Sequence, residues 1–245
     1  MTTVAWLHNE IAPGSAFLPG EHAGGGEMAD AGMIAHAPAG VTVTRVSAPD
    51  WRQAMDADRI VVAATDQLPD DAMTTLAERK PLVWVHHQQQ PSAARATLLR
   101  LADPFVCMSA AHADLEAAWS GTTPVWNHGW VDPDDVAPGR KRHEALWAAR
   151  NHPQKGRTNA RIWAQRNDVP LVELTDVTRA TVLTHMAQAR WFVFLPKGFD
   201  SCPRTLLEAE LAGCEIVTNH LAGRRDAGDL RAVLLAQPGK FWGWL

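Results

Sequence analysis

Two acidic residues, Asp200 and Glu208, stand with seven residues between them around the start of an expected helix. The run 191–195 before them is continuously apolar and too short for a helix, so it predicts a strand buried on both faces. Pro203 suits the first turn of the helix, and Gly213 stands where a left-handed C-cap is expected. In a parallel sheet such a helix begins at the carboxyl edge, where its dipole and unpaired N–H groups favour a phosphate. Asp200 and Glu208 can therefore face one ligand crevice.

Basic side chains dominate residues 139–166, where eight Lys and Arg residues face one acid, Glu144. Within this segment an expected strand at 145–149 leads to Arg150, and Lys155 follows shortly afterwards. Fixed cations and a helix N-terminus can stabilise the charge that gathers on a diphosphate leaving group, without a metal. A solvated basic surface is the alternative interpretation, because surface helices commonly have one.

A glycine run, Gly24, Gly25 and Gly26, precedes an expected helix from Glu27 to about residue 34. Such a run lets backbone N–H groups approach a phosphate closely. It is not a dinucleotide fingerprint, because it lies far from the first expected strand and lacks the Gly-x-Gly-x-x-Gly spacing. A surface loop would give the same pattern.

Two histidines, His86 and His87, follow the expected strand 82–85. Polar residues at the carboxyl end of a buried strand lie at the edge where ligands bind. We expect one of the two to line the site, and the sequence does not choose between them. The alternative is an imidazole with a structural role.

The composition is that of an ordinary globular protein, with 46% hydrophobic and 20% charged residues among 245. A net charge of −4 argues against a chain coated with nucleic acid but allows a local basic patch. No membrane-length apolar stretch or secretory signal is present, so we expect a cytoplasmic protein with Cys107, Cys202 and Cys214 as reduced thiols. The acidic cluster 132–135 lies in a Pro-broken linker, so we predict no metal site.

Strand and helix patterns alternate along the whole chain, which predicts an α/β fold with parallel sheets. We expect strands at 3–7, 41–46, 59–64, 82–85, 104–108, 125–130, 145–149, 171–174, 191–195 and from 216. Expected helices cover 27–34, 69–79, 92–101, 109–119 and 178–189, with another from 230. We predict an N-terminal Rossmann-like domain at 1–138, a second at 139–230, and a segment, 231–245, that returns to the first domain.

These motifs together resemble the donor site of the retaining GT-B glycosyltransferases, especially glycosyltransferase family 4. That family has an acidic residue, seven residues and then Glu-Ala-x-x-x-Gly, which stands here as Asp200 and the run 208–213. Its Gly-Gly-x-Glu motif, its strand-end histidine, and its arginine followed by Lys-Gly also have counterparts. The chain departs by having Asp at 200, where Glu is usual, and by lacking a strand–helix unit in the second half.

The resemblance implies a GT-B fold, in which two Rossmann-like domains face a central cleft, with the second domain reduced. It implies transfer of a sugar from a nucleotide diphosphate donor to a hydroxyl acceptor, with retention and with no metal or other cofactor. The implied roles are diphosphate binding for Arg150 and Lys155, ribose binding for Glu208, and sugar binding for Asp200. The donor site would also include the glycines of 24–26, together with Lys197 and Gly198 of the loop after the strand 191–195. Of the catalytic candidates, Asp200 would bind the sugar, and His86 or His87 would help to arrange the sugar and the acceptor.

The acceptor stays open between a glycan or other small hydroxyl compound and a 5-hydroxymethylpyrimidine in phage DNA. A catalytically inactive protein that binds nucleotide sugars, or a scaffold, is the alternative from another class. A Rossmann dehydrogenase is disfavoured, because no glycine fingerprint follows the first strand. The sequence does not predict the oligomeric state.

Overall fold

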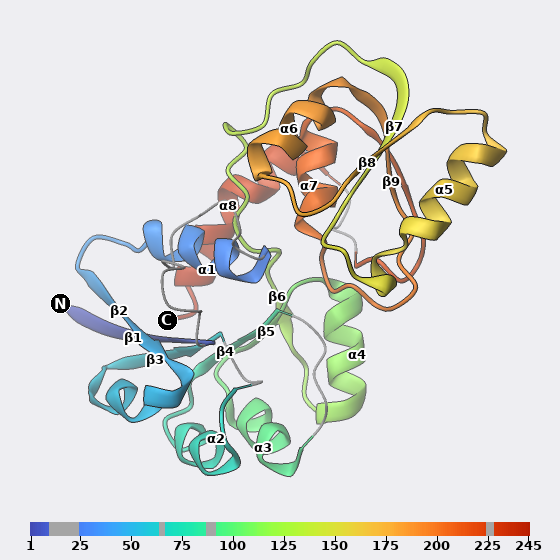
Figure 1. Cartoon of the computed structure of the whole chain (residues 1–245). Coiled ribbons are helices and arrows are strands. Elements are labelled where there is room, and N and C mark those ends of the chain that lie inside the picture. The colour runs from blue at the N-terminus through green and yellow to red at the C-terminus, as the bar shows by residue number, and fades with distance from the viewer. Residues whose placement is uncertain (10–24, 64–66, 87–91, 224–227) are drawn as a thin grey trace.

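The computed structural model describes residues 1–9, 25–63, 67–86, 92–223 and 228–245. They form two α/β lobes, each built on a parallel sheet (Figure 1). The first lobe contains β1 (Thr2–His8), α1 (Gly25–Ala35), β2 (Val41–Ser47), the 3-10 helix η1 (Ala48–Asp56), β3 (Arg59–Val62), α2 (Asp70–Ala77), β4 (Leu82–Val85), α3 (Ala93–Leu101), β5 (Phe105–Cys107), α4 (Ala110–Ser120) and β6 (Val125–Trp126). The second contains β7 (Arg142–Ala148), the 3-10 helix η2 (Pro153–Lys155), α5 (Arg157–Arg166), β8 (Leu171–Leu174), α6 (Arg179–Gln188), β9 (Ala189–Phe194), α7 (Arg204–Leu211) and β10 (Glu215–Thr218). The last helix is α8 (Leu230–Trp242).

Each lobe is built on its own sheet, and every strand pairing is parallel, as predicted. The first sheet has the order β2-β1-β3-β4-β5-β6, and the second has the order β10-β9-β7-β8. The order reverses between β1 and β3 in the first sheet and between β7 and β9 in the second. In open parallel sheets, ligands bind outside the carboxyl ends of the strands at such reversal points.

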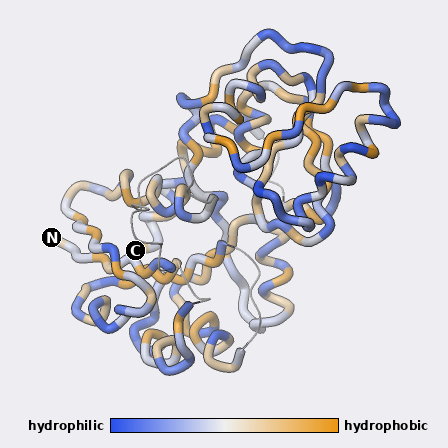
Figure 2. Tube along the Cα trace, in the orientation of Figure 1, coloured by the Kyte–Doolittle hydropathy of each residue, from blue (hydrophilic) through white to orange (hydrophobic). Residues whose placement is uncertain are grey.

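The strand β9 is buried on both faces, as its apolar run predicts. Phe192 and Phe194 pack on the side of α6 and α7, whereas Val193 packs on the side of α5. The trace coloured by hydropathy shows the apolar segments gathered along the strands of both lobes (Figure 2). The helix after β9 begins next to Pro203, its N-cap, and ends before Gly213, whose φ of 78° is left-handed.

The helix α8 packs against the first lobe, beside α1. Phe241 lies 5.4 Å from Trp6 and 4.9 Å from Trp84 between ring centroids, and the indole of Trp242 donates to the Met33 carbonyl. These aromatic side chains share one buried cluster with α1. The chain therefore crosses back from the second lobe to complete the core of the first (Figure 1).

The largest difference from the predicted elements is the strand expected at 125–130, which ends at Trp126. The N–H of Asn127 still donates to the Cys107 carbonyl, and its side chain bonds elsewhere. Its buried side chain accepts from Gly129 N–H and donates to the Gln237 carbonyl of α8. Ser109 caps α4 by accepting from the backbone N–H of His112.

Candidate functional site

A cleft of about 900 Å³ runs between the carboxyl ends of the two sheets. It includes His8 at the end of β1, Asn9 after β1 and Ala63 after β3, which mark the reversal point of the first sheet. Arg150 after β7 and Gly198 after β9 mark the reversal point of the second sheet. The cleft therefore lies where both sheets are expected to bind a ligand.

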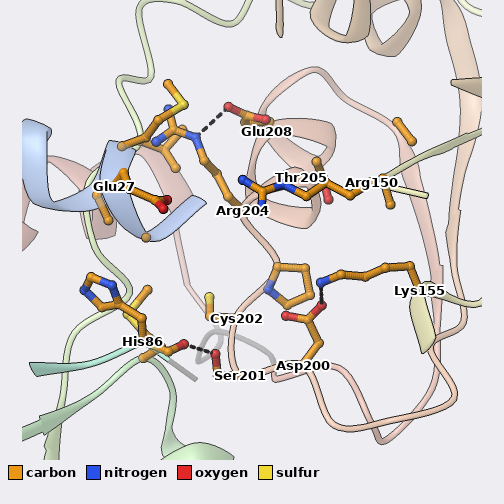
Figure 3. Close-up of a pocket in the computed structure, with 18 of the residues that line it drawn as sticks. Glu27, His86, Arg150, Lys155, Asp200, Ser201, Cys202, Arg204, Thr205 and Glu208 are labelled. Carbon is orange, nitrogen blue, oxygen red and sulfur yellow. Dashed lines mark hydrogen bonds and ion pairs between the residues drawn. The ribbon is translucent and has the colours of Figure 1, made fainter. Parts of the chain in front are cut away.

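Cations and a carboxylate from the second lobe form one wall of this cleft. Lys155 Nζ lies 2.6 Å from Asp200 Oδ2, and their side chains are 35% and 16% exposed. Figure 3 shows Arg150 and Lys155 on the same side, with Lys155 reaching towards Asp200. A fixed cation pair of this kind can hold an anionic group of a ligand.

Local backbone structure fixes the position of Lys155. It ends η2, where the side chain of His152 accepts from the N–H of Gln154. Gly156 follows with a φ of 77°, and a Cβ at this position would lie 2.0 Å from the Leu195 carbonyl oxygen. Only glycine fits there, because the loop after β7 packs directly on the end of β9.

The carboxylate of Glu208 is held between two arginines. Its Oε1 lies 2.9 Å from the Nε atoms of both Arg179 and Arg204, and its side chain is 3% exposed. Burial alone would lower the pKa of Arg179, but Glu208 and Asp135 outweigh this effect and raise it. Glu208 is therefore a buried, ion-paired residue of the cleft and not a solvated glutamate on a helix surface.

Side chains of the first lobe form the opposite wall. His86 Nε2 lies 3.2 Å from Asp30 Oδ1 of α1, and Trp84 meets the imidazole edge-on at 4.6 Å. A Cβ on Gly26 would lie 2.6 Å from His86 Nδ1, so the glycine lets α1 begin directly against this ring. Burial raises the pKa of Asp30, although His86 opposes the rise.

The loop before α7 connects the two walls. Ser201 Oγ donates to the carbonyl of His86, and Ser109 Oγ donates to the carbonyl of Ser201 at 2.6 Å. The N–H of Gly223 donates to the carbonyl of Asp200 at 2.6 Å. These bonds hold Asp200 in a fixed position relative to the first lobe.

Cys202 also lines the cleft, and its surroundings make it unreactive. Burial, with a smaller contribution from Asp200, raises the pKa of the thiol to about 12. The thiolate, which is the nucleophilic form, is therefore scarce at neutral pH. Covalent catalysis by Cys202 is disfavoured on this ground.

Most of the predicted site residues that the structure describes line this one cleft: Gly26, His86, Arg150, Lys155, Gly198, Asp200 and Glu208. Lys197 does not line it. Its N–H donates to the Gln154 carbonyl, and its side chain is exposed to solvent. Gly25 is the first residue of α1, whereas Gly24 and His87 lie outside the described residues.

Several other cations of the segment 139–166 have structural partners. Lys141 Nζ donates to the carbonyls of Met186 and Ala212, and Arg157 and Arg161 both bind Glu173. The side chains of these three residues are therefore bound within the second lobe. Arg150 and Lys155 are the two cations of that segment that line the cleft.

Several charged residues of the cleft were not predicted from the sequence, among them Asp30, Asp176, Arg179 and Arg204. Arg204 stands four residues before Glu208, a spacing that brings two side chains together on a helix, and this signal could have found it. Asp30 interrupts an apolar helix face, which is a weaker signal. No sequence signal indicates Arg179, because its contact with Glu208 depends on how α6 packs against α7.

No group of three or more His, Cys, Asp or Glu side chains in the described part of the chain is arranged to hold a metal ion. None of the helices described has the length and apolar composition needed to cross a membrane.

Two facing α/β lobes with parallel sheets and a cleft between them define the GT-B glycosyltransferase fold, and comparison with solved structures confirms this prediction. Sucrose-phosphate synthase from Thermosynechococcus elongatus aligns with a TM-score of 0.63 and 11% identity, over 100% of this chain and 92% of that one. AviGT4, a glycosyltransferase involved in avilamycin A biosynthesis, aligns with a TM-score of 0.61 and 15% identity, over 97% and 89%.

A third similar structure is an alpha-glucosyltransferase in complex with UDP and a 13-mer DNA containing a HMU base. It aligns with a TM-score of 0.53 and 12% identity, over 89% of this chain and 79% of that one. No protein-family model and no curated protein sequence matches the chain. At these identities the likeness establishes the fold.

Proposed function

We propose that this protein is a glycosyltransferase that moves a sugar from a nucleotide diphosphate donor to a hydroxyl acceptor. The observation that carries the proposal is the convergence of Arg150, Lys155, Asp200 and Glu208 on one cleft at the reversal points of both sheets. The similar structures support it, because they include glycosyltransferases and one of them contains UDP.

The charges of the cleft suit this reaction. When the bond between the sugar and the phosphate breaks, negative charge gathers on the diphosphate. Arg150 and Lys155 would stabilise that charge more strongly in the transition state than in the bound donor. Lys155 would exchange Asp200 for a phosphate oxygen, which leaves Asp200 able to accept hydrogen bonds from sugar hydroxyls.

Glu208 would bind the ribose hydroxyls of the nucleotide through its remaining oxygen, since Oε1 accepts from Arg179 and Arg204. These arginines hold the carboxylate in place. Retention of configuration, membership of glycosyltransferase family 4 and catalysis without a metal are parts of the proposal that rest on the sequence resemblance.

The proposal can be tested by measuring the melting temperature of the chain and its affinity, by calorimetry, for a panel of nucleotide diphosphate sugars. A donor that binds the folded chain raises its melting temperature by mass action. We expect at least one donor to do so and to be hydrolysed slowly to its nucleoside diphosphate. Tight binding without hydrolysis or transfer to any acceptor would favour the inactive binding protein or scaffold, and no binding by any donor would refute both.

A further inference from the structure

The two lobes carry opposite net charge. Residues 1–138 together with 231–245, which pack on the first lobe, contain 9 Lys and Arg against 17 Asp and Glu, whereas residues 139–230 contain 14 against 10. The formal charges are therefore −8 and +4, which together give the −4 of the whole chain. If the second lobe binds the donor, the acceptor must approach along the negative lobe.

The same division holds inside the cleft. Its Lys and Arg side chains, among the described residues, all come from the second lobe: Arg150, Lys155, Arg179 and Arg204. The first lobe contributes Glu27 and Asp30, and Figure 3 shows Glu27 across the cleft from Arg150 and Lys155. The first-lobe stretches 10–24, 64–66 and 87–91 contain no Lys or Arg, whereas the second-lobe stretch 224–227, outside the described residues, contains Arg224 and Arg225.

Each described Lys or Arg side chain of the cleft already has a carboxylate partner or a proposed role in binding the donor. Arg179 and Arg204 bind Glu208, and Lys155 binds Asp200. Arg150 and Lys155 are the pair proposed for the donor diphosphate. A phosphate on the acceptor would therefore face the carboxylates of the first lobe, and none of the described cations of the cleft is left to bind it.

Asp30 points to the kind of ligand that this wall accepts. It lines the cleft with 4% of its surface exposed, and the donors that act on its carboxyl group come from His86 and Trp6, so a ligand against this wall adds to them only if it carries donors of its own. A buried carboxylate is costly unless hydrogen-bond donors satisfy it. Hydroxyl and ammonium groups supply such donors, whereas an ionised phosphate does not.

We propose that the acceptor is a small, phosphate-free compound rich in hydroxyl or amino groups, bound against Glu27 and Asp30, and not a nucleic acid. This inference rests on the proposed function. An acceptor oxygen would bond to the anomeric carbon as the bond from that carbon to the diphosphate breaks. The products are the glycoside and the nucleoside diphosphate, and the hydroxyl proton is released with the latter.

The test uses the full chain with two kinds of probe, each with and without a nucleotide sugar. One is a duplex containing 5-hydroxymethylcytosine, and the other is the matched pair glucosamine and glucosamine 6-phosphate. We expect no duplex binding or modification at low salt, and weaker binding of the phosphorylated amino sugar than of its parent. Duplex binding that falls steeply with salt, sugar transfer to the duplex, or a preference for the phosphorylated sugar would overturn the proposal.

Reversing the charge of Glu27 should create duplex binding, which the same duplex probe can detect. We expect Glu27→Lys to give measurable duplex binding at low salt where the wild type gives none, because an added lysine in the cleft can neutralise a phosphate. Glu78→Lys makes the same change in net charge at an exposed position outside the cleft and should give less binding. Equal effects of the two variants, or none, would show that the acidic wall does not select the acceptor.

The proposed function and this inference fail in different ways. If no nucleotide sugar raises the melting temperature, the proposed function is refuted, whatever the duplex does. If a nucleotide sugar binds and the duplex is modified, the proposed function stands and the inference about the acceptor is refuted.

Discussion

The donor assignment depends most directly on Lys155, whose ammonium group contacts Asp200 in the cleft. We expect Lys155→Ala to weaken donor binding by about 10- to 100-fold, because a hydrogen bond to a charged group contributes about 1.5–3 kcal/mol and each 1.4 kcal/mol is tenfold. Calorimetry with the best nucleotide sugar measures this change.

Lys197 provides the matched control, because it is a lysine of the neighbouring loop that is exposed and does not line the cleft. Lys197→Ala should leave donor affinity within about twofold of the wild type, since surface charges contribute little. If both variants bound the donor as the wild type does, the diphosphate role of Lys155 would be wrong.

Asp30 should reduce stability at neutral pH. Because burial raises its pKa, the folded state holds the proton more tightly than the unfolded state does. Stability is therefore lost as the pH rises from the ordinary Asp value through the folded pKa. We expect Asp30→Asn to melt at a higher temperature than the wild type at pH 8, with the difference shrinking as the pH falls towards about 4. A lower melting temperature at pH 8 would contradict this.

Asp58 should behave in the opposite way and serves as the control. The backbone N–H and the hydroxyl of Thr3 bind its carboxylate and lower its pKa. This group stabilises the fold above its unfolded pKa, and the contribution is lost as the pH falls through the folded pKa. Thermal melts should show that Asp58→Asn lowers the melting temperature at pH 8.

The loop from β7 to α5 requires glycine at 156. An alanine would adopt an unfavourable φ and place its Cβ against the Leu195 carbonyl, so we expect lost stability and weaker donor binding through displacement of Lys155. Gly121 has a similar φ of 70° with nothing within 4 Å of the added Cβ. Melting curves should show a clearly smaller effect for Gly121→Ala, and equal effects would mean that the close approach is not a constraint.

Much of the cleft could be predicted from the order of the elements. Since parallel strands end at one edge, residues directly after expected strands, such as Arg150 and His86, meet there. Contacts between helices could not be predicted in this way. Arg179 reaches Glu208 through the packing of two helices whose positions in the sequence are far apart. The strand from Val125 was predicted too long, because an apolar run does not show where ladder pairing stops.

Across the whole molecule, α8 joins the two halves of the chain, and Phe241 is its most buried aromatic side chain. It contacts Trp6 and Trp84 in the core of the first lobe. We expect Phe241→Ala to destabilise the protein by about 3–5 kcal/mol, because it removes a fully buried ring and leaves a cavity. Chemical denaturation measures this loss. Leu235→Ala, at a 55% exposed position of the same helix, should cost far less.

The division of charge between the lobes is the feature of the whole molecule that relates the fold to the reaction. The positive lobe would hold the diphosphate, and the negative lobe would receive the acceptor. The net charge of the whole chain hides this division, because the opposite charges of the two lobes largely cancel.

The crystal structure of the chain with a nucleoside diphosphate bound tests the central claim most directly. We predict that the diphosphate lies between Arg150 and Lys155 and that Lys155 has exchanged Asp200 for a phosphate oxygen. The ribose should contact Glu208. A diphosphate bound elsewhere, with the ion pair between Lys155 and Asp200 intact, would contradict the account.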